Sequence, residues 1–120
     1  MEGLLLRFVK LLLVCLVLSG SAPLAAPASA AAAPYTEVDA AIDSAGLPPI
    51  FHTIAARESG DNPYVVNPYS GACGPFQFLP STAWEYGYTC YELQDPYIAA
   101  QAAYELWWDY GLSPWALTAY

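Results

Sequence analysis

The sequence predicts a mostly α-helical fold in one small domain, because 120 residues leave room for a single core. Three observations support this class. Apolar residues recur at helical spacing in several segments. These segments begin at capping residues or prolines and end at glycines or prolines. A stretch rich in proline, asparagine and glycine separates them and favours an irregular segment or a short β-hairpin.

The first two predicted helices lie before that stretch. Thr36 can cap a helix that has acidic residues in its first turn, and Gly46 provides its end. Val38, Ala41, Ile42 and Ala45 repeat on one face of it. Prolines at residues 48–49 open the second helix, which we expect to end near Gly60. Residues 61–80 then contain four prolines and are expected to cover the domain surface as an ordered segment.

Three further helical segments are expected after residue 80. Ser81 would cap a short helix that runs through Tyr86. The pair at residues 95–96, Asp-Pro, opens a helix to about residue 110. Its expected apolar face consists of Ile98, Ala102, Leu106 and Tyr110. A last helical turn opens at Ser-Pro, residues 113–114.

Residues 1–30 are predicted to be a cleavable signal peptide. Arg7 and Lys10 precede an apolar run at residues 11–18, and small residues end in Ala-Ser-Ala before Ala31. The run is much shorter than the roughly 20 residues that span a bilayer. An uncleaved signal anchor is the alternative. Cys15 follows a valine, where a lipoprotein signal would have a small residue, so lipid anchoring is not expected.

The predicted mature domain, residues 31–120, is strongly acidic. It has ten carboxylates and one basic side chain, Arg57, which gives a net charge of −9. Nucleic acid and anionic membranes are therefore excluded as partners, because nothing would neutralise their phosphates. The domain also contains ten tyrosines, four tryptophans and three phenylalanines. These rings would form part of the core, and exposed ones would suit stacking on sugars.

The mature domain has two cysteines, Cys73 and Cys90. In an exported protein we expect them to form a disulfide, although two buried thiols are the alternative. The bridge would close a loop of 18 residues and stabilise the fold by about 3 kcal/mol. A domain of this size buries a modest core, so such a link matters.

The candidate chemistry begins with Glu58 at the end of the second helix. A carboxylic acid that can donate its proton in an apolar cleft is what cleavage of a glycosidic bond needs. A solvated glutamate at a helix end is the ordinary alternative. The following segments are more specific: Glu58 and Ser59 precede Gly-x-x-Gln at residues 74–77 and Pro-Ser-Thr at residues 80–82.

In this order, the motifs resemble the lysozyme-like (goose-type) domain of bacterial soluble lytic transglycosylases. They are also similar to the related resuscitation-promoting-factor domains, and the match covers residues 48–120. The resemblance implies that Glu58 is the only catalytic acid and base, and that Ser59 supports the end of its helix. It also implies that Gln77 and Leu79 line the substrate groove, with Leu79 where methionine is usual. Ser70 would hydrogen-bond the sugar N-acetyl group.

The sequence departs from the family pattern at three points. Pro75 replaces the usual leucine, and the spacing from Glu58 to Gln77 is slightly long. The downstream Ala-Tyr-Asn-x-Gly motif is present only as residues 119–120. Tyr120 would then assist the acid or the leaving group, or else be a frayed residue.

The resemblance implies a secreted, monomeric lytic transglycosylase that cleaves peptidoglycan strands without a metal or another cofactor. Glu58 would form 1,6-anhydro-muramyl ends. Hydrolysis commonly uses a second carboxylate, and Asp61 is the nearest in sequence. A hydrolysing muramidase of the same fold is one alternative, and a non-catalytic wall-binding protein is another. The biological role is left open by the sequence.

Overall fold

The computed structural model of the protein describes residues 33–120. Its helices are α2 (Glu37–Ala45), α3 (Ile50–Ser59), α4 (Pro80–Glu85), α5 (Pro96–Tyr110) and α6 (Ala116–Ala119), with 3-10 turns η2 (Glu92–Gln94) and η3 (Ser113–Trp115). Isolated bridges are the only β-structure in this part of the chain, so the predicted mostly α class is confirmed. The signal peptide predicted for residues 1–30 lies outside the described residues.

The helix ends follow the local sequence closely. The Thr36 side chain accepts from the Asp39 amide, and the Asp39 carboxylate accepts from the Thr36 amide, which forms a capping box. Asp95 caps α5 by accepting from two main-chain amides. Gly60 ends α3 in the left-handed conformation, with φ of 62°.

The expected cap at Ser81 is wrong. The helix α4 begins at Pro80, and Leu79 occupies the N-cap position without a side-chain hydrogen bond. The φ angle of a proline is already helical and its missing N–H is not needed in the first turn. Pro80 therefore starts the helix before Ser81 can cap it.

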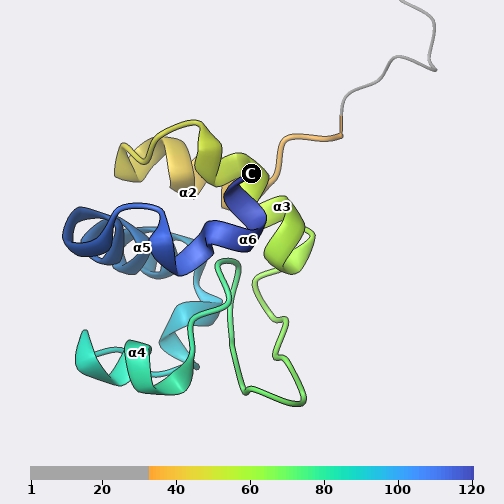
Figure 1. Ribbon diagram of the computed structural model, residues 1–120. Coiled ribbons are helices and arrows are strands. Elements are labelled where there is room, and N and C mark those ends of the chain that lie inside the picture. Colours follow the sequence, from red (N-terminus) through yellow and green to blue (C-terminus); the bar gives the residue numbers. More distant parts are fainter. Residues whose placement is uncertain (1–32) are drawn as a thin grey trace, which may run out of the picture. The chain divides into compact units, whose positions relative to one another are not determined.

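The core forms where α2 packs against α5 and where α3 packs against α2 and α6 (Figure 1). Phe51 of α3 lies at its centre and is fully buried. Its ring meets Trp115 edge to face at a centroid distance of 5.0 Å, and Phe76 at 6.0 Å. The aromatic residues thus connect α3, the irregular segment and η3 in one core.

The segment between α3 and α4 contains the short hairpin. Cys73 pairs with Val66 and with Phe78 in antiparallel bridges, and residues 74–77 form the turn. Gly74 is required in this turn, because a Cβ atom there would lie 2.5 Å from the Leu93 carbonyl oxygen. The predicted disulfide is present between Cys73 and Cys90, with Cα atoms 5.7 Å apart.

Tyr110 differs from its predicted position on the apolar face of α5. The buried residues of this helix are Pro96, Ala99, Ala100, Ala102, Ala103 and Leu106, whereas Tyr110 is exposed. Tyr110 is in the last turn of the helix, where its ring lines a surface pocket instead of entering the core. No helix in residues 33–120 combines the length and apolar character needed to cross a membrane.

Candidate active site

Glu58 lies in the last turn of α3 and is half-buried. Its Oε1 accepts a hydrogen bond of 2.7 Å from the Thr118 hydroxyl, which belongs to α6. The same Thr118 oxygen lies 3.2 Å from the main-chain oxygen of Trp115. A hydroxyl has one proton, so Thr118 can donate to only one of these acceptors at a time.

Arg57 fixes α6 against the end of α3. Its Nη1 donates to the main-chain oxygens of Thr118 and Tyr120, each at 2.9 Å. A cation suits this place, because the last carbonyl groups of a helix carry partial negative charge. The residue next to Glu58 therefore holds in place the helix that carries its hydrogen-bond donor.

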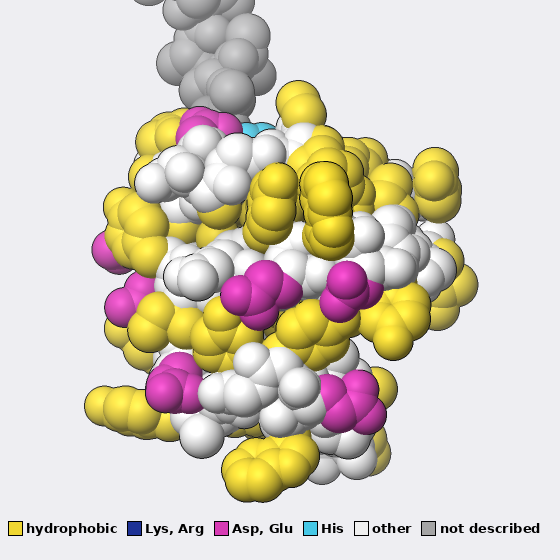
Figure 2. Space-filling model, turned by 90° about the vertical axis from the view of Figure 1, so that its left-hand side faces the viewer, with side chains coloured by type: hydrophobic (Ala, Val, Ile, Leu, Met, Phe, Trp, Pro, Cys, Tyr) yellow, Lys and Arg dark blue, Asp and Glu magenta, His cyan; other side chains and the backbone are white. Residues whose placement is uncertain are grey.

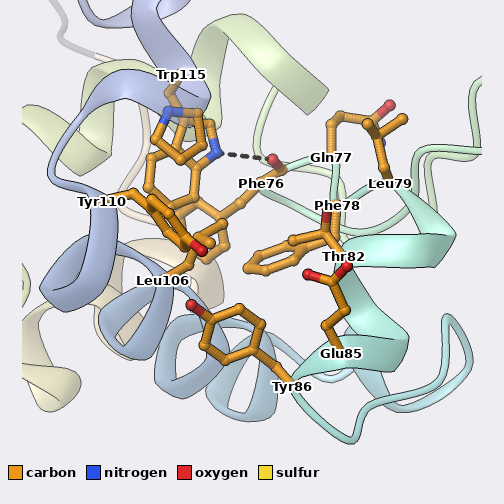
Figure 3. A pocket seen from close by; sticks show the side chains of 11 residues that line it. Phe76, Gln77, Phe78, Leu79, Thr82, Glu85, Tyr86, Leu106, Tyr110 and Trp115 are labelled. Atoms are coloured by element: carbon orange, nitrogen blue, oxygen red, sulfur yellow. Dashed lines mark hydrogen bonds between the residues drawn. The ribbon is translucent and has the colours of Figure 1, made fainter.

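A pocket of about 310 Å³ opens between α4, the end of α5 and η3 (Figure 3). Phe78 and Trp115 lie on its wall, and Glu85 and Tyr110 project toward the hollow. The Trp115 indole N–H donates to the Phe76 carbonyl at 3.0 Å, which fixes the wall. The pocket thus combines rigid ring surfaces with a few polar groups, as ligand pockets commonly do.

Gln77 and Leu79 both line this pocket. Gln77 has a left-handed backbone with φ of 51°, and its Nε2 donates to the main-chain oxygens of Val65 and Gly74, each at 3.0 Å. Glu58 is not among the lining residues. Its hydrogen-bond donor Thr118 follows the pocket residue Trp115 by three positions, so the short segment of η3 and α6 contacts both Glu58 and the pocket.

The sequence matches the transglycosylase SLT domain family over residues 38–119. The chain belongs to this family. Its domains act on cell-wall peptidoglycan by lytic transglycosylase-type cleavage. No curated protein and no solved structure matches the chain.

The three other residues assigned from the family resemblance lie outside the lining of the pocket. The Ser59 hydroxyl donates to the Ala55 carbonyl one turn earlier, so it is engaged inside its own helix. The Ser70 hydroxyl accepts from the Ala72 amide in an exposed turn. Tyr120 is 85% exposed, and its main-chain oxygen accepts from Arg57.

Thr118 is the site residue that the sequence did not indicate. It lies 60 positions after Glu58, and a threonine in a short apolar helix carries no pattern that links it to a distant glutamate. Arg57 was noted as the only basic residue of the SLT domain, but its contact with α6 depends on the tertiary fold. Both contacts appear only when α6 packs on α3.

Asp61, the nearest other carboxylate in sequence, faces a different environment. Burial raises its pKa, and the negative charge of Asp39 adds to this shift. Its Oδ1 is buried and has no hydrogen-bond partner among residues 33–120. An oxygen without solvent contact is poorly placed to activate water.

The other end of α3 contains an ionic cluster around His52. Its Nδ1 lies 2.6 Å from Asp39 and its Nε2 lies 2.9 Å from Asp43, both on α2. Burial opposes protonation of the ring, but these hydrogen bonds outweigh it and raise the pKa of His52. Within the described residues, no group of three or more histidine, cysteine or acidic side chains is placed to hold a metal ion.

Proposed function

We propose that this SLT domain protein is a lytic transglycosylase in which Glu58 acts alone as acid and base. The observation that carries the proposal is the 2.7 Å hydrogen bond to Glu58 from Thr118, three residues after Trp115, which lines the same pocket as Gln77. It supports a carboxyl group that is positioned by a neutral hydroxyl and is not paired with a cation among residues 33–120. Family membership supports the choice of peptidoglycan as the substrate.

In the first step, protonated Glu58 donates its proton to the oxygen that links N-acetylmuramic acid to N-acetylglucosamine. The bond from this oxygen to C1 of the muramic sugar breaks, and the electron pair leaves with the N-acetylglucosamine unit. The acetamido group of the same muramic sugar stabilises the positive charge at C1. General acid catalysis of this kind is the common basis of glycosidic cleavage.

In the second step, ionised Glu58 accepts the proton of the muramic 6-hydroxyl, and the 6-oxygen bonds to C1. The product is a 1,6-anhydro ring, and Glu58 is protonated again for the next cycle. No water enters the reaction and no net proton is consumed.

We propose Thr118 as the positioning residue for both states of Glu58. When Glu58 is ionised, the hydroxyl donates to its Oε1 at 2.7 Å. When Glu58 is protonated at Oε2, its Oε1 is a carbonyl oxygen and can still accept from the same hydroxyl, so the proton at Oε2 stays available to the glycosidic oxygen. One side chain thus orients the carboxyl group before and after proton transfer.

The lyase is favoured over a hydrolase because Asp61, the acid that follows Glu58 most closely, lacks support as a second catalytic carboxylate. Retaining and inverting hydrolases place their two carboxyl groups roughly 5 Å or 6.5–9.5 Å apart. Asp61 is the nearest acid in sequence, and its buried Oδ1 argues against contact with a substrate. The muramidase and the non-catalytic wall-binding protein are the alternatives that an experiment must separate.

We propose that the domain works as a monomer outside the cell, after removal of residues 1–30. The disulfide between Cys73 and Cys90 supports an oxidising location. The acidic composition supports a glycan partner over nucleic acid, because residues 33–120 carry one basic side chain.

The test is mass spectrometry of purified peptidoglycan after digestion by residues 31–120. Anhydro-muramyl ends are one water lighter than hydrolysed ends, so the product mass identifies the reaction. Hydrolysed ends would replace the lyase with a muramidase. Binding without any new ends, from a folded protein, would indicate the wall-binding protein.

A further inference from the structure

A second hollow lies on the outer side of α5, where several aromatic residues are exposed. Tyr104 and Trp108 are one turn apart, and their rings are nearly parallel, at 15° with centroids 6.4 Å apart. The Trp108 side chain is 74% exposed. With Tyr86, Glu105 and Asp109 they line a hollow of about 520 Å³. Rings left exposed together in this way commonly mark a binding surface.

Two carboxylates in the hollow are fixed by tyrosine hydroxyls. The Tyr86 hydroxyl donates to Asp109 Oδ2 at 2.6 Å, and the Tyr88 hydroxyl donates to Glu105 Oε1 at 3.1 Å. The second oxygen of each carboxylate accepts no hydrogen bond from residues 33–120. These oxygens can therefore accept hydrogen bonds from a ligand, beside flat ring surfaces on which a ligand can stack.

The charge on this side of the domain favours an uncharged ligand rich in hydroxyl groups. Figure 2 shows hydrophobic side chains around several acidic ones, with no lysine or arginine visible on this face. Glu105 and Asp109 would repel a phosphate or carboxylate ligand. A pyranose has an apolar C–H face for the rings and hydroxyl hydrogens for the carboxylates, so it matches both features.

The hollow adjoins the first pocket at a single shared residue. Tyr86 lines both, and its ring stands at the end of α4 between Glu85 and α5 (Figure 3). A polymer that occupies the first pocket can therefore extend over Tyr86 toward Trp108. One extended ligand could therefore contact both hollows across Tyr86.

We infer that the hollow between Tyr86 and Trp108 is a distal glycan subsite that stacks a neutral N-acetylglucosamine unit of the strand held near Glu58. This inference rests on the proposed function, because it takes the strand in the first pocket as peptidoglycan. The subsite would hold the enzyme on long strands. It would discriminate against the muramic sugar, whose peptide-bearing side chain carries carboxylates toward Glu105 and Asp109.

The test compares Trp108→Ala with Trp84→Ala, both in a Glu58→Gln background that prevents turnover. Trp84 is the matched control, because it is 78% exposed on α4 and does not line the hollow. The probe is the β-1,4-linked hexamer of N-acetylglucosamine, and the dissociation constant is measured by calorimetry. We expect Trp108→Ala to weaken binding about tenfold, as for a stacked anchor residue, and Trp84→Ala to change it less than about twofold.

Trp108→Tyr keeps a ring at the position and should restore most of the affinity, which separates stacking from a folding defect. Equal affinity for Trp108→Ala and Trp84→Ala would overturn the subsite. So would a Trp108-dependent affinity for an oligolysine peptide and none for the sugar, since this would indicate a cationic protein partner. Anhydro ends produced by the wild type test the proposed function separately. If the wild type forms no anhydro-muramyl ends, but Trp108→Ala still weakens binding of the hexamer, the subsite is supported and the lytic transglycosylase activity is contradicted.

Discussion

Carboxylates lie at both ends of α3 in contrasting surroundings, with Asp39 and Asp43 on α2 at one end and Glu58 of α3 at the other. At its first turns, His52 bridges Asp39 and Asp43, so acids and base compensate one another. At its last turn, Glu58 is held by the neutral Thr118 hydroxyl, while the adjacent arginine bonds to main-chain oxygens. The first arrangement stabilises charges and joins α3 to α2. The second fixes the position of a carboxyl group without pairing it with a cation, which suits proton transfer.

The largest expected effect is the loss of cleavage in Glu58→Gln. The glutamine can still accept from Thr118, so the fold should persist, but it cannot donate and recover a proton. We expect activity on peptidoglycan to fall by a factor on the order of 10²–10⁴. Asp43→Asn at the other end of α3 is the control and should retain activity. Full activity in Glu58→Gln would remove this residue from the mechanism.

The second prediction concerns the disulfide that fixes the hairpin beside the pocket. The double variant Cys73→Ala, Cys90→Ala should lose about 3 kcal/mol of unfolding free energy, measured by urea denaturation. The mature protein should also show no free thiol. Alkylation of both cysteines without denaturant would contradict the bridge.

The third prediction concerns the hydrogen bond from Thr118 to Glu58 at the last turn of α3. Thr118→Val keeps the shape of the side chain and removes its hydroxyl. Hydrogen bonds to charged groups contribute about 1.5–3 kcal/mol. We therefore expect kcat to fall about tenfold or more, with a smaller change in KM. Thr118→Ser should restore most of kcat. Equal loss in both variants would indicate a packing role alone.

The fold around these residues was predictable where the signals are local. The capping pair Thr36 and Asp39, the Asp95 cap and the left-handed Gly60 all act within a few residues, and their helices were predicted. The prediction that Ser81 caps α4 was wrong because Pro80 itself starts the helix one residue earlier. The candidate site divides in the same way. Gln77 could be predicted from the Gly-x-x-Gln motif. The contact of Thr118 with Glu58 could not, because it depends on how α6 packs against α3.

A fourth prediction concerns pH and the His52 end of α3. The pKa of His52 is raised above 6.5, so its contribution to stability is full below about 6.5 and is lost as pH rises through the folded-state pKa. Burial opposes ionisation of Asp39, but hydrogen bonds from Thr36 and His52 outweigh it and lower its pKa from 3.8. The contribution of Asp39 to stability is therefore full above about pH 3.8 and is lost as pH falls through its folded-state pKa.

Measurement of melting temperature against pH in wild type and His52→Gln tests this cluster. The two proteins should differ most between about pH 4 and 6.5, and should converge at higher pH. Asp61 also contributes to the pH dependence. Because burial raises its pKa, its ionisation is less favourable in the folded state, and the free energy of unfolding falls as pH rises. The charge of His52 partly offsets this shift, so the loss is larger in His52→Gln and adds to the difference at pH values where His52 is charged. A constant difference across this range would show that His52 acts through packing.

The smallest effect is expected from salt. Peptidoglycan carries carboxylates and the domain has a net charge of −9, so long-range attraction does not assist binding. Physiological salt screens exposed charges beyond roughly 8–10 Å. Activity should stay constant or rise between low and physiological salt, at fixed pH and without a basic tag. A steep fall in activity over this range would mean that a positively charged group or bound cation attracts the substrate to the domain.

The geometry of Gln77 determines the polarity of what can bind beside it. Both hydrogens of its amide are directed to main-chain oxygens of the hairpin, at Val65 and Gly74. With both hydrogens engaged, the amide can offer a ligand only its oxygen, Oε1. A ligand must meet this oxygen with a donor, such as an acetamido N–H or a hydroxyl, and a carbonyl or carboxylate at the same position would be repelled. The backbone of the hairpin thus limits Gln77 to the role of an acceptor.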